Sequence, residues 1–131
     1  KEKYNVSFTF QNPNELEYTG AIKSAKHLFG DYNVVLLPDT ILQLKNNADL
    51  YNIVMDRLNS TGFTFFYKKE SNAFMLSTKG SLFVENDLVK LYEDKPTEKY
   101  ERFNAYWTSF AFTKNNFDSS MNFMEKQELL R

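Results

Sequence analysis

The 131-residue chain contains no cysteine, only 4 glycines and a single histidine. Without cysteine, a disulfide scaffold, a cysteine-based zinc site and a thiol nucleophile are all excluded. One histidine cannot form a metal cluster, and His27 lies on the polar face of an expected helix, so we expect it to be exposed to solvent. The glycine-rich phosphate loops with known spacing are also missing.

Long apolar runs and an excess of basic residues are absent as well. The longest apolar runs are a few residues, too short to span a bilayer, and no signal peptide is visible. The formal net charge is −1, which gives no reason to expect a nucleic acid or an anionic membrane as a partner. A cytoplasmic protein fits these absences, and we expect that location.

The composition that remains is that of a globular domain. Hydrophobic residues make up 42% of the chain, charged residues 25% and aromatic residues 17%, including 13 Phe and 8 Tyr. We therefore predict a single domain over residues 1–131 with a bulky aromatic core, and we expect Trp107 to lie in that core or in a pocket wall.

Apolar periodicity predicts alternating strands and helices up to residue 67. Alternation predicts a strand at 4–10, and a helical stripe follows from Thr19, the expected N-cap, to Gly30, the expected left-handed end. The run at 34–37 reads as a strand buried on both faces. A helix at 48–59, ended by Gly62, and a strand at 63–67 complete the series, which favours βαβ units.

The pattern changes after residue 68. Short strands are predicted at 73–77, 81–85 and 87–93, then a strand at 105–113 and a last helix from 118 or 119 to 130. The predicted fold class is α/β: a mostly parallel, Rossmann-like open sheet flanked by helices, with a small antiparallel insertion around residues 73–93.

Asp39 follows the predicted strand at 34–37. The carboxyl ends of parallel strands are where open α/β sheets bind ligands, and a carboxylate there could hold Mg²⁺, which takes few protein ligands and keeps waters and phosphate oxygens. The alternative is that Pro38-Asp39-Thr40 is a turn in which Asp39 bonds to the local backbone. Spacing alone favours this alternative.

Two further polar residues each allow a functional and a purely structural interpretation. Lys95 could contact a phosphate as a point charge, or it could be a solvated turn residue before Pro96. Gln11 could hydrogen-bond the edge of a nucleobase, or it could be an ordinary loop residue. Taken singly, the plain alternative is favoured for both.

Taken in order, these segments resemble the sugar-phosphate nucleotidyltransferase (sugar-1-phosphate pyrophosphorylase) family. That family has a strand ending in Gln, a polar loop and a helix of the type G-[TL]-A-x-A, then a strand ending in Gly-Asp or Pro-Asp-Thr, then Glu-Lys-Pro, an Asn and a further strand. The corresponding residues in this chain are Phe10-Gln11, EYTGAI at 17–22, VVLLPDT at 34–40, DKP at 94–96, and Asn104 to Phe112.

The resemblance implies transfer of a nucleotidyl group from a nucleoside triphosphate to a sugar 1-phosphate, giving a nucleotide sugar and pyrophosphate. It implies Mg²⁺ as cofactor, with alignment and charge neutralisation doing most of the catalytic work. The implied roles are Asp39 for the metal, Lys95 for the sugar phosphate, Gln11, Glu17 and Tyr18 for the nucleotide, and Asp94, Asn104, Thr108 and Ser109 for the sugar.

The chain departs from the family in four ways. Glu17 and Ser109 stand where the family usually has Gly, the first βα unit with its Gly-rich basic loop is absent, and so is a later metal-binding Asp. We therefore expect an incomplete domain, whose sheet would be completed by a missing chain segment or in a homo-oligomer. The alternative function is a catalytically inactive module that binds a nucleotide sugar or a partner protein. A third, poorer possibility is an unrelated small α/β domain.

Overall fold

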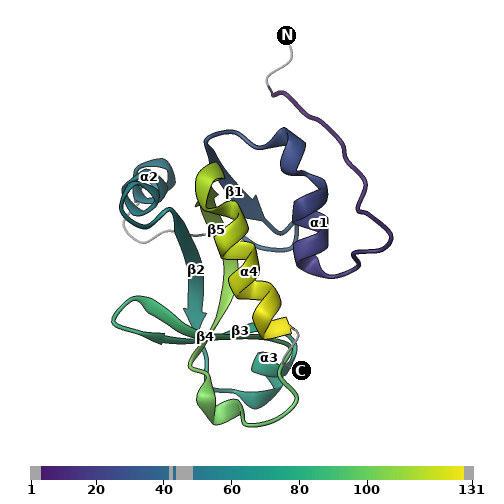
Figure 1. Ribbon diagram of the computed structural model, residues 1–131. Coiled ribbons are helices and arrows are strands. Elements are labelled where there is room, and N and C mark those ends of the chain that lie inside the picture. Colours follow the sequence, from purple (N-terminus) through teal and green to yellow (C-terminus); the bar gives the residue numbers. More distant parts are fainter. Residues whose placement is uncertain (1–3, 42, 44–48, 129–131) are drawn as a thin grey trace.

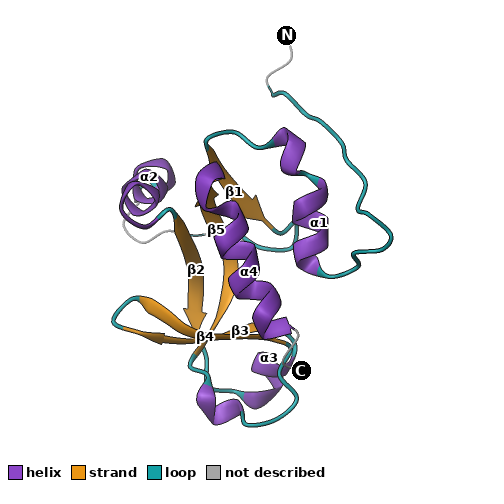
Figure 2. Ribbon diagram, in the orientation of Figure 1, coloured by secondary structure: helices purple, strands orange, loops and turns teal. Residues whose placement is uncertain are grey.

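The computed structural model describes residues 4–41, 43 and 49–128, and helices pack on both faces of its single sheet (Figures 1 and 2). The elements, in chain order, are α1 (Tyr18–Ser24), η1 (Lys26–Leu28), β1 (Tyr32–Leu36), α2 (Leu50–Thr61), β2 (Phe63–Lys69), α3 (Ala73–Ser77), β3 (Gly80–Glu85), β4 (Leu88–Asp94), η3 (Tyr100–Arg102), β5 (Ala105–Thr113), η4 (Lys114–Asn116) and α4 (Phe117–Glu128).

Strand β5 is the centre of the sheet. It pairs with β2 on one edge, and with β1 and then β3 on the other, while β4 pairs with β3. All four pairings are antiparallel. The fold is therefore α+β, and the prediction of a mostly parallel, Rossmann-like sheet was wrong.

The direction of the early strands explains the error. Because β1 and β2 each run antiparallel to β5, they run parallel to one another, with α2 between them in the sequence. That is the βαβ order predicted from periodicity. The strand that separates them in space is β5, the last strand in the sequence, and local periodicity carries no information about such an insertion.

β1 is an edge strand. In the described part of the chain it pairs only with β5, and its residues alternate between exposed Tyr32, Val34 and Leu36 and half-buried Asn33 and Val35. The prediction that 34–37 is buried on both faces was therefore wrong. Val35 and Leu37 do pack against the main core, so one face of the apolar run is used.

The predicted strand at 4–10 is an extended arm without a strand partner in the described chain. The helix that follows is also shorter than expected. It begins at Tyr18, with Glu17 rather than Thr19 as N-cap, and Thr19 is buried inside it. It ends at Ser24 and is continued by η1, so Gly30 does not end it in the left-handed conformation. His27 is exposed, as predicted.

The middle of the chain is closer to prediction. Helix α2 matches the predicted 48–59 stripe with shifted ends, although Ala48 lies outside the described residues. Gly62 ends this helix, as expected, and it does so in the left-handed conformation. Strand β2 is confirmed, but the strand predicted at 73–77 is helix α3, begun by an Asn72 side chain that accepts a bond from the Met75 N–H.

The later strands and the last helix are confirmed. β3 and β4 form a hairpin whose turn residues, Asn86 and Asp87, both have positive φ, the conformation that suits the twist of a two-residue hairpin. β5 matches the predicted bounds. α4 begins at Phe117, ahead of the predicted cap at Asp118 or Ser119, and its predicted end at Leu130 lies outside the described residues.

Two apolar clusters lie on opposite faces of the sheet. The larger joins Phe110 and Phe112 of β5 to α1 and α4, whose Lys23 and Glu125 form an ion pair. The smaller joins Ala111 to Val54 and Leu58 of α2. The alternation of Phe110, Ala111 and Phe112 shows why: successive strand residues point to opposite faces. Trp107 belongs to the larger cluster, as predicted. No helix in the described part is long and apolar enough to cross a membrane.

Candidate functional site

The edge of β5 shared by β1 and β3 has a break. β1 ends with Leu36 opposite Ser109, whereas β3 pairs with β5 only from Ser81, opposite Tyr106. Both strands run antiparallel to β5, so the end of β1 points toward the start of β3. We call the stretch of this edge at Trp107 and Thr108, between those two strands, the junction.

Asp39 lies just after β1, beyond the end of that strand that borders the junction. Residues Leu37 to Thr40 form a turn, closed by a bond of 3.0 Å from the Thr40 N–H to the Leu37 carbonyl. The turn reading is therefore correct for the backbone. The Asp39 carboxylate, however, is exposed and makes no hydrogen bond or ion pair with the described part of the chain, so the local side-chain bond is not made.

Asp94 and Lys95 lie at the end of the β3–β4 hairpin, beside the start of β3. Asp94, the last residue of β4, pairs with Gly80, the first residue of β3. The Lys95 N–H then donates to the Lys79 carbonyl at 2.9 Å, with φ of 49° at Lys95, and the Lys95 side chain is exposed. Because β3 lies between β4 and β5, this end of β4 is one strand away from the break, beside the start of β3.

Aromatic rings form the wall of the junction. The Tyr18 and Trp107 rings lie 5.2 Å apart, and burial raises the pKa of the Tyr18 hydroxyl to about 12. Trp107 is buried, and its Nε1–H has no partner in the described chain. A Cβ on Gly80 would lie 1.9 Å from that nitrogen, so the close approach of β3 requires glycine there.

The two other β5 residues predicted to line a sugar pocket are engaged or enclosed. Thr108 is the extra residue of a bulge against β2, and its hydroxyl donates to the Phe66 carbonyl at 3.1 Å. Ser109 is fully buried, and its Oγ has no partner in the described chain. Sequence reasoning did not single out Trp107 Nε1 and Ser109 Oγ as buried polar atoms without a partner in the described chain. The burial of a strand residue depends on the elements that pack around it, and a single sequence does not show them.

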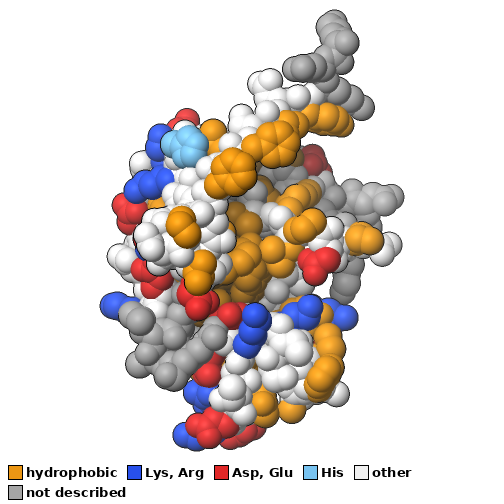
Figure 3. All heavy atoms as spheres, turned by 90° about the vertical axis from the view of Figure 1, so that its right-hand side faces the viewer, with side chains coloured by type: hydrophobic (Ala, Val, Ile, Leu, Met, Phe, Trp, Pro, Cys, Tyr) orange, Lys and Arg blue, Asp and Glu red, His pale blue; other side chains and the backbone are white. Residues whose placement is uncertain are grey.

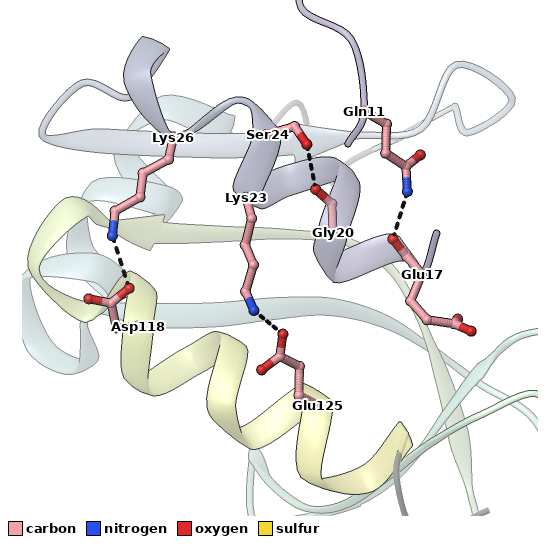
Figure 4. Close-up of polar contacts among 8 residues, drawn as sticks. All are labelled: Gln11, Glu17, Gly20, Lys23, Ser24, Lys26, Asp118 and Glu125. Atoms are coloured by element: carbon pink, nitrogen blue, oxygen red, sulfur yellow. Dashed lines mark hydrogen bonds and ion pairs between the residues drawn. The ribbon is translucent and has the colours of Figure 1, made fainter. Parts of the chain in front are cut away.

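Gln11 and Glu17 lie together before α1 (Figure 4). The Gln11 Nε2 group donates to the carbonyl oxygens of Glu15 at 2.6 Å and Glu17 at 3.1 Å. The N–H groups of the Gln11 amide therefore bind the loop to the start of α1. The Glu17 side chain makes no capping bond and is exposed.

Asn104 lies further from the junction than the residues at the strand ends. Its amide pairs with the backbone of Val84, accepting from the N–H and donating to the carbonyl, each at 2.8 Å. The amide oxygen and the amide nitrogen of Asn104 are therefore both bonded to β3, as the backbone groups of a paired strand residue would be.

A metal ion at the junction could have only few ligands from the described residues. The described residues contain no group of three or more His, Asp or Glu side chains that could hold a metal ion together. Asp39 fits the other arrangement, in which a single free carboxylate meets an ion that keeps its waters and its phosphate ligands.

A separate cleft of about 450 Å³ lies between β2, the hairpin tip and α4. Its lining includes apolar Phe63, Phe65 and Phe123, with Arg57 and Asp87 among the polar residues. Sequence reasoning missed it, because it depends on how the hairpin curls toward β2.

No known protein-family model matches this chain, and a search of curated proteins found no similar sequence.

Proposed function

We propose that this chain forms part of a sugar-phosphate nucleotidyltransferase, which transfers a nucleotidyl group from a nucleoside triphosphate to a sugar 1-phosphate and releases pyrophosphate. One observation carries the proposal. Pro38-Asp39-Thr40 follows the end of β1, which borders the junction, and Asp94-Lys95-Pro96, more than fifty residues later, follows the end of β4 beside the start of β3, the other strand that borders it. The proposed function does not require a parallel sheet.

In this proposal the exposed groups at the junction act on phosphate. Asp39 would hold Mg²⁺, which when bound neutralises phosphate charge. Lys95 binds the sugar phosphate through its ammonium group, a compact point charge on a flexible stem. The Tyr18 and Trp107 rings exclude water from one side, which strengthens these charge interactions.

The resemblance gives Asp94, next to Lys95, as the proposed sugar contact. The other residues proposed for the sugar are engaged or enclosed, because the Asn104 amide is bonded to Val84, the Thr108 hydroxyl to Phe66, and Ser109 is buried. For the nucleotide, Tyr18 offers a ring face. Gln11 would read a base through its acceptor oxygen, since its amide donors bind the backbone.

A second candidate is a catalytically inactive module that binds a nucleotide sugar or a partner protein. The observation that favours it is the pair formed by Gln11 and Glu17: the donors of Gln11 are occupied, and the exposed Glu17 carboxylate repels a triphosphate. Such a module would bind an uncharged base and sugar portion without turning over a triphosphate.

Pyrophosphate release by the intact protein with Mg²⁺ tests the enzyme. Each of the four nucleoside triphosphates is offered with a panel of sugar 1-phosphates. For the productive pair, Asp39→Asn is expected to lower kcat at least about a hundredfold, as removal of a directed charge-stabilising group does. The matched control is Asp56→Asn, an exposed carboxylate on α2 that should leave kcat unchanged.

Lys95→Gln is expected to raise KM for the sugar 1-phosphate about tenfold while the control Lys90→Gln, on the exposed side of β4, does not. Thermal unfolding of each variant excludes misfolding. Wild-type turnover in Asp39→Asn rejects the metal role. Binding of nucleotide sugars without any pyrophosphate release supports the inactive module instead.

A further inference from the structure

The N-terminal arm, residues Tyr4 to Phe10, is an apolar strand sequence, and residues 5–10 pair with no strand of the described chain. Val6, Phe8 and Phe10 are 70%, 89% and 92% exposed. The backbone of residues 5–10 makes no hydrogen bond to the backbone of the described chain. Exposed aromatic residues in this number and spacing indicate an interaction surface.

The base of the arm is fastened to α1. The Thr9 hydroxyl donates to the Ser24 carbonyl at 3.2 Å, and the Asn12 N–H donates to the Ser24 hydroxyl at 2.9 Å. In Figure 1 the arm runs along the outer side of α1, with β1 on the other side of that helix, and its N-terminal end projects beyond the body. The arm is therefore directed away from its own sheet.

β1 offers the matching open edge. It pairs only with β5 in the described chain, and Tyr32, Val34 and Leu36 remain exposed on one face. Natural edge strands are usually protected by charged residues, proline or a bulge. Neither β1 nor the arm contains a charged residue or a proline, so nothing in either sequence opposes pairing.

We propose that two copies of this chain exchange their arms, each arm adding a strand to the free edge of β1 in the other copy. One donor and one acceptor are present in every copy, so a two-fold dimer satisfies both at once and closes the assembly. The second copy, rather than the arm's own body, is the partner because the bonds to Ser24 hold the arm base on the outer side of α1.

The pairing would join two apolar surfaces. An added strand places alternate residues on one face, so Val6, Phe8 and Phe10 can extend the face formed by Tyr32, Val34 and Leu36. The polar residues Asn5, Ser7 and Thr9 then share the opposite face. Figure 3, which looks toward the arm, shows hydrophobic side chains gathered in a hollow below it.

Sedimentation equilibrium of the 131-residue chain tests the exchange. The expected result is a dimer whose dissociation constant rises at least about tenfold in Phe8→Lys and in Val34→Lys, because a charge placed on a pairing edge opposes strand addition. The matched control is Phe74→Lys on α3, a Phe that is also exposed but lies on neither element. A chain that stays monomeric at about 500 µM overturns the proposal.

Cysteine cross-linking identifies the partner segments, because the chain has no cysteine of its own. A mixture of Phe8→Cys and Val34→Cys chains is expected to form a mixed disulfide dimer, whereas Phe74→Cys with Val34→Cys is not. A dimer insensitive to Phe8→Lys, or without this mixed disulfide, rejects arm exchange. A double variant Phe8→Cys/Val34→Cys that closes within a monomer shows instead that the arm pairs with its own β1, which also overturns the proposal.

Discussion

The tripeptide Phe-Thr-Phe occurs twice in this chain, with opposite fates. At residues 63–65 it begins β2, pairs with β5 and contributes rings to the main core. At residues 8–10 it belongs to the arm, and both rings are almost fully exposed. The local sequence favours an extended backbone in both places, but only one copy finds a neighbouring strand. Identical local preferences therefore yield a strand only where another part of the chain provides the hydrogen-bonding edge and the apolar surface.

The same contrast separates larger regions. From β2 to α4 nearly every apolar stripe packs against another element. Phe65, for example, contacts the rings of Tyr92, Trp107 and Phe110. From the arm to β1, apolar residues on one side of each extended segment face solvent. The first region contains its own partners, whereas the second leaves apolar side chains exposed in the described part of the chain.

The largest expected difference is between alanine substitutions in the two tripeptides. Phe65→Ala removes a ring packed among others and should lower the free energy of unfolding by about 2–3 kcal/mol. Phe10→Ala removes an exposed ring and should change the free energy by less than about 0.5 kcal/mol. Urea unfolding of the monomer at low protein concentration measures both. Equal losses would show that the arm packs on its own body.

The entry into β2 gives the next effect. Gly62 has φ of 75°, and an added Cβ would lie 2.2 Å from the Asn116 side-chain nitrogen. Gly62→Ala should therefore destabilise the chain by about 1–2 kcal/mol. Gly30→Ala is the control, because a Cβ there meets no atom closer than 3.8 Å. A neutral effect of Gly62→Ala in the urea midpoint would mean that the α2–β2 turn does not require this conformation.

The pH dependence sharpens the comparison at Tyr18, the α1 ring that joins the core. Its pKa is raised to about 12 by burial, from an ordinary value of about 10. The protonated phenol is thus favoured in the folded chain, so this contribution is complete below about pH 10 and is lost as pH rises toward 12. Unfolding midpoints between these values should fall more steeply for the wild type than for Tyr18→Phe. Tyr51→Phe, on an exposed part of α2, should retain the wild-type slope.

The smallest effect concerns the ion pair that links the two regions. Lys23 of α1 meets Glu125 of α4, and both side chains are partly exposed (Figure 4). Glu125→Gln should cost about 0.5 kcal/mol, and this difference should shrink in high salt. The more exposed pair of Lys26 with Asp118 is the comparison: Asp118→Asn should have a smaller effect. A loss at Glu125 that salt does not reduce would indicate a packing role instead.

Part of the candidate site could be predicted from the sequence. The turn after residues 34–37 and the strand end before Lys95 were visible in the pattern, because Pro38 ends an apolar run and Pro96 follows the charged residues that close the last short strand. That one end borders the break in β5 and the other lies beside the start of β3 could not be predicted, since both depend on strand register between distant segments. The bonding of Asn104 to Val84 is likewise a tertiary event.

The sequence by itself determined the positions of α2, β2, β3, β4, β5 and α4, because their periodicity and turn residues act within a few residues. Gly62 and the Asn86–Asp87 turn are examples, each set by local backbone preference. Only the tertiary structure decided that β5 separates β1 from β2, that 73–77 is helical and that the arm pairs with no strand in the described part of the chain. Burial and pairing depend on contacts between segments far apart in the chain, and the energies of those contacts exceed the local preferences.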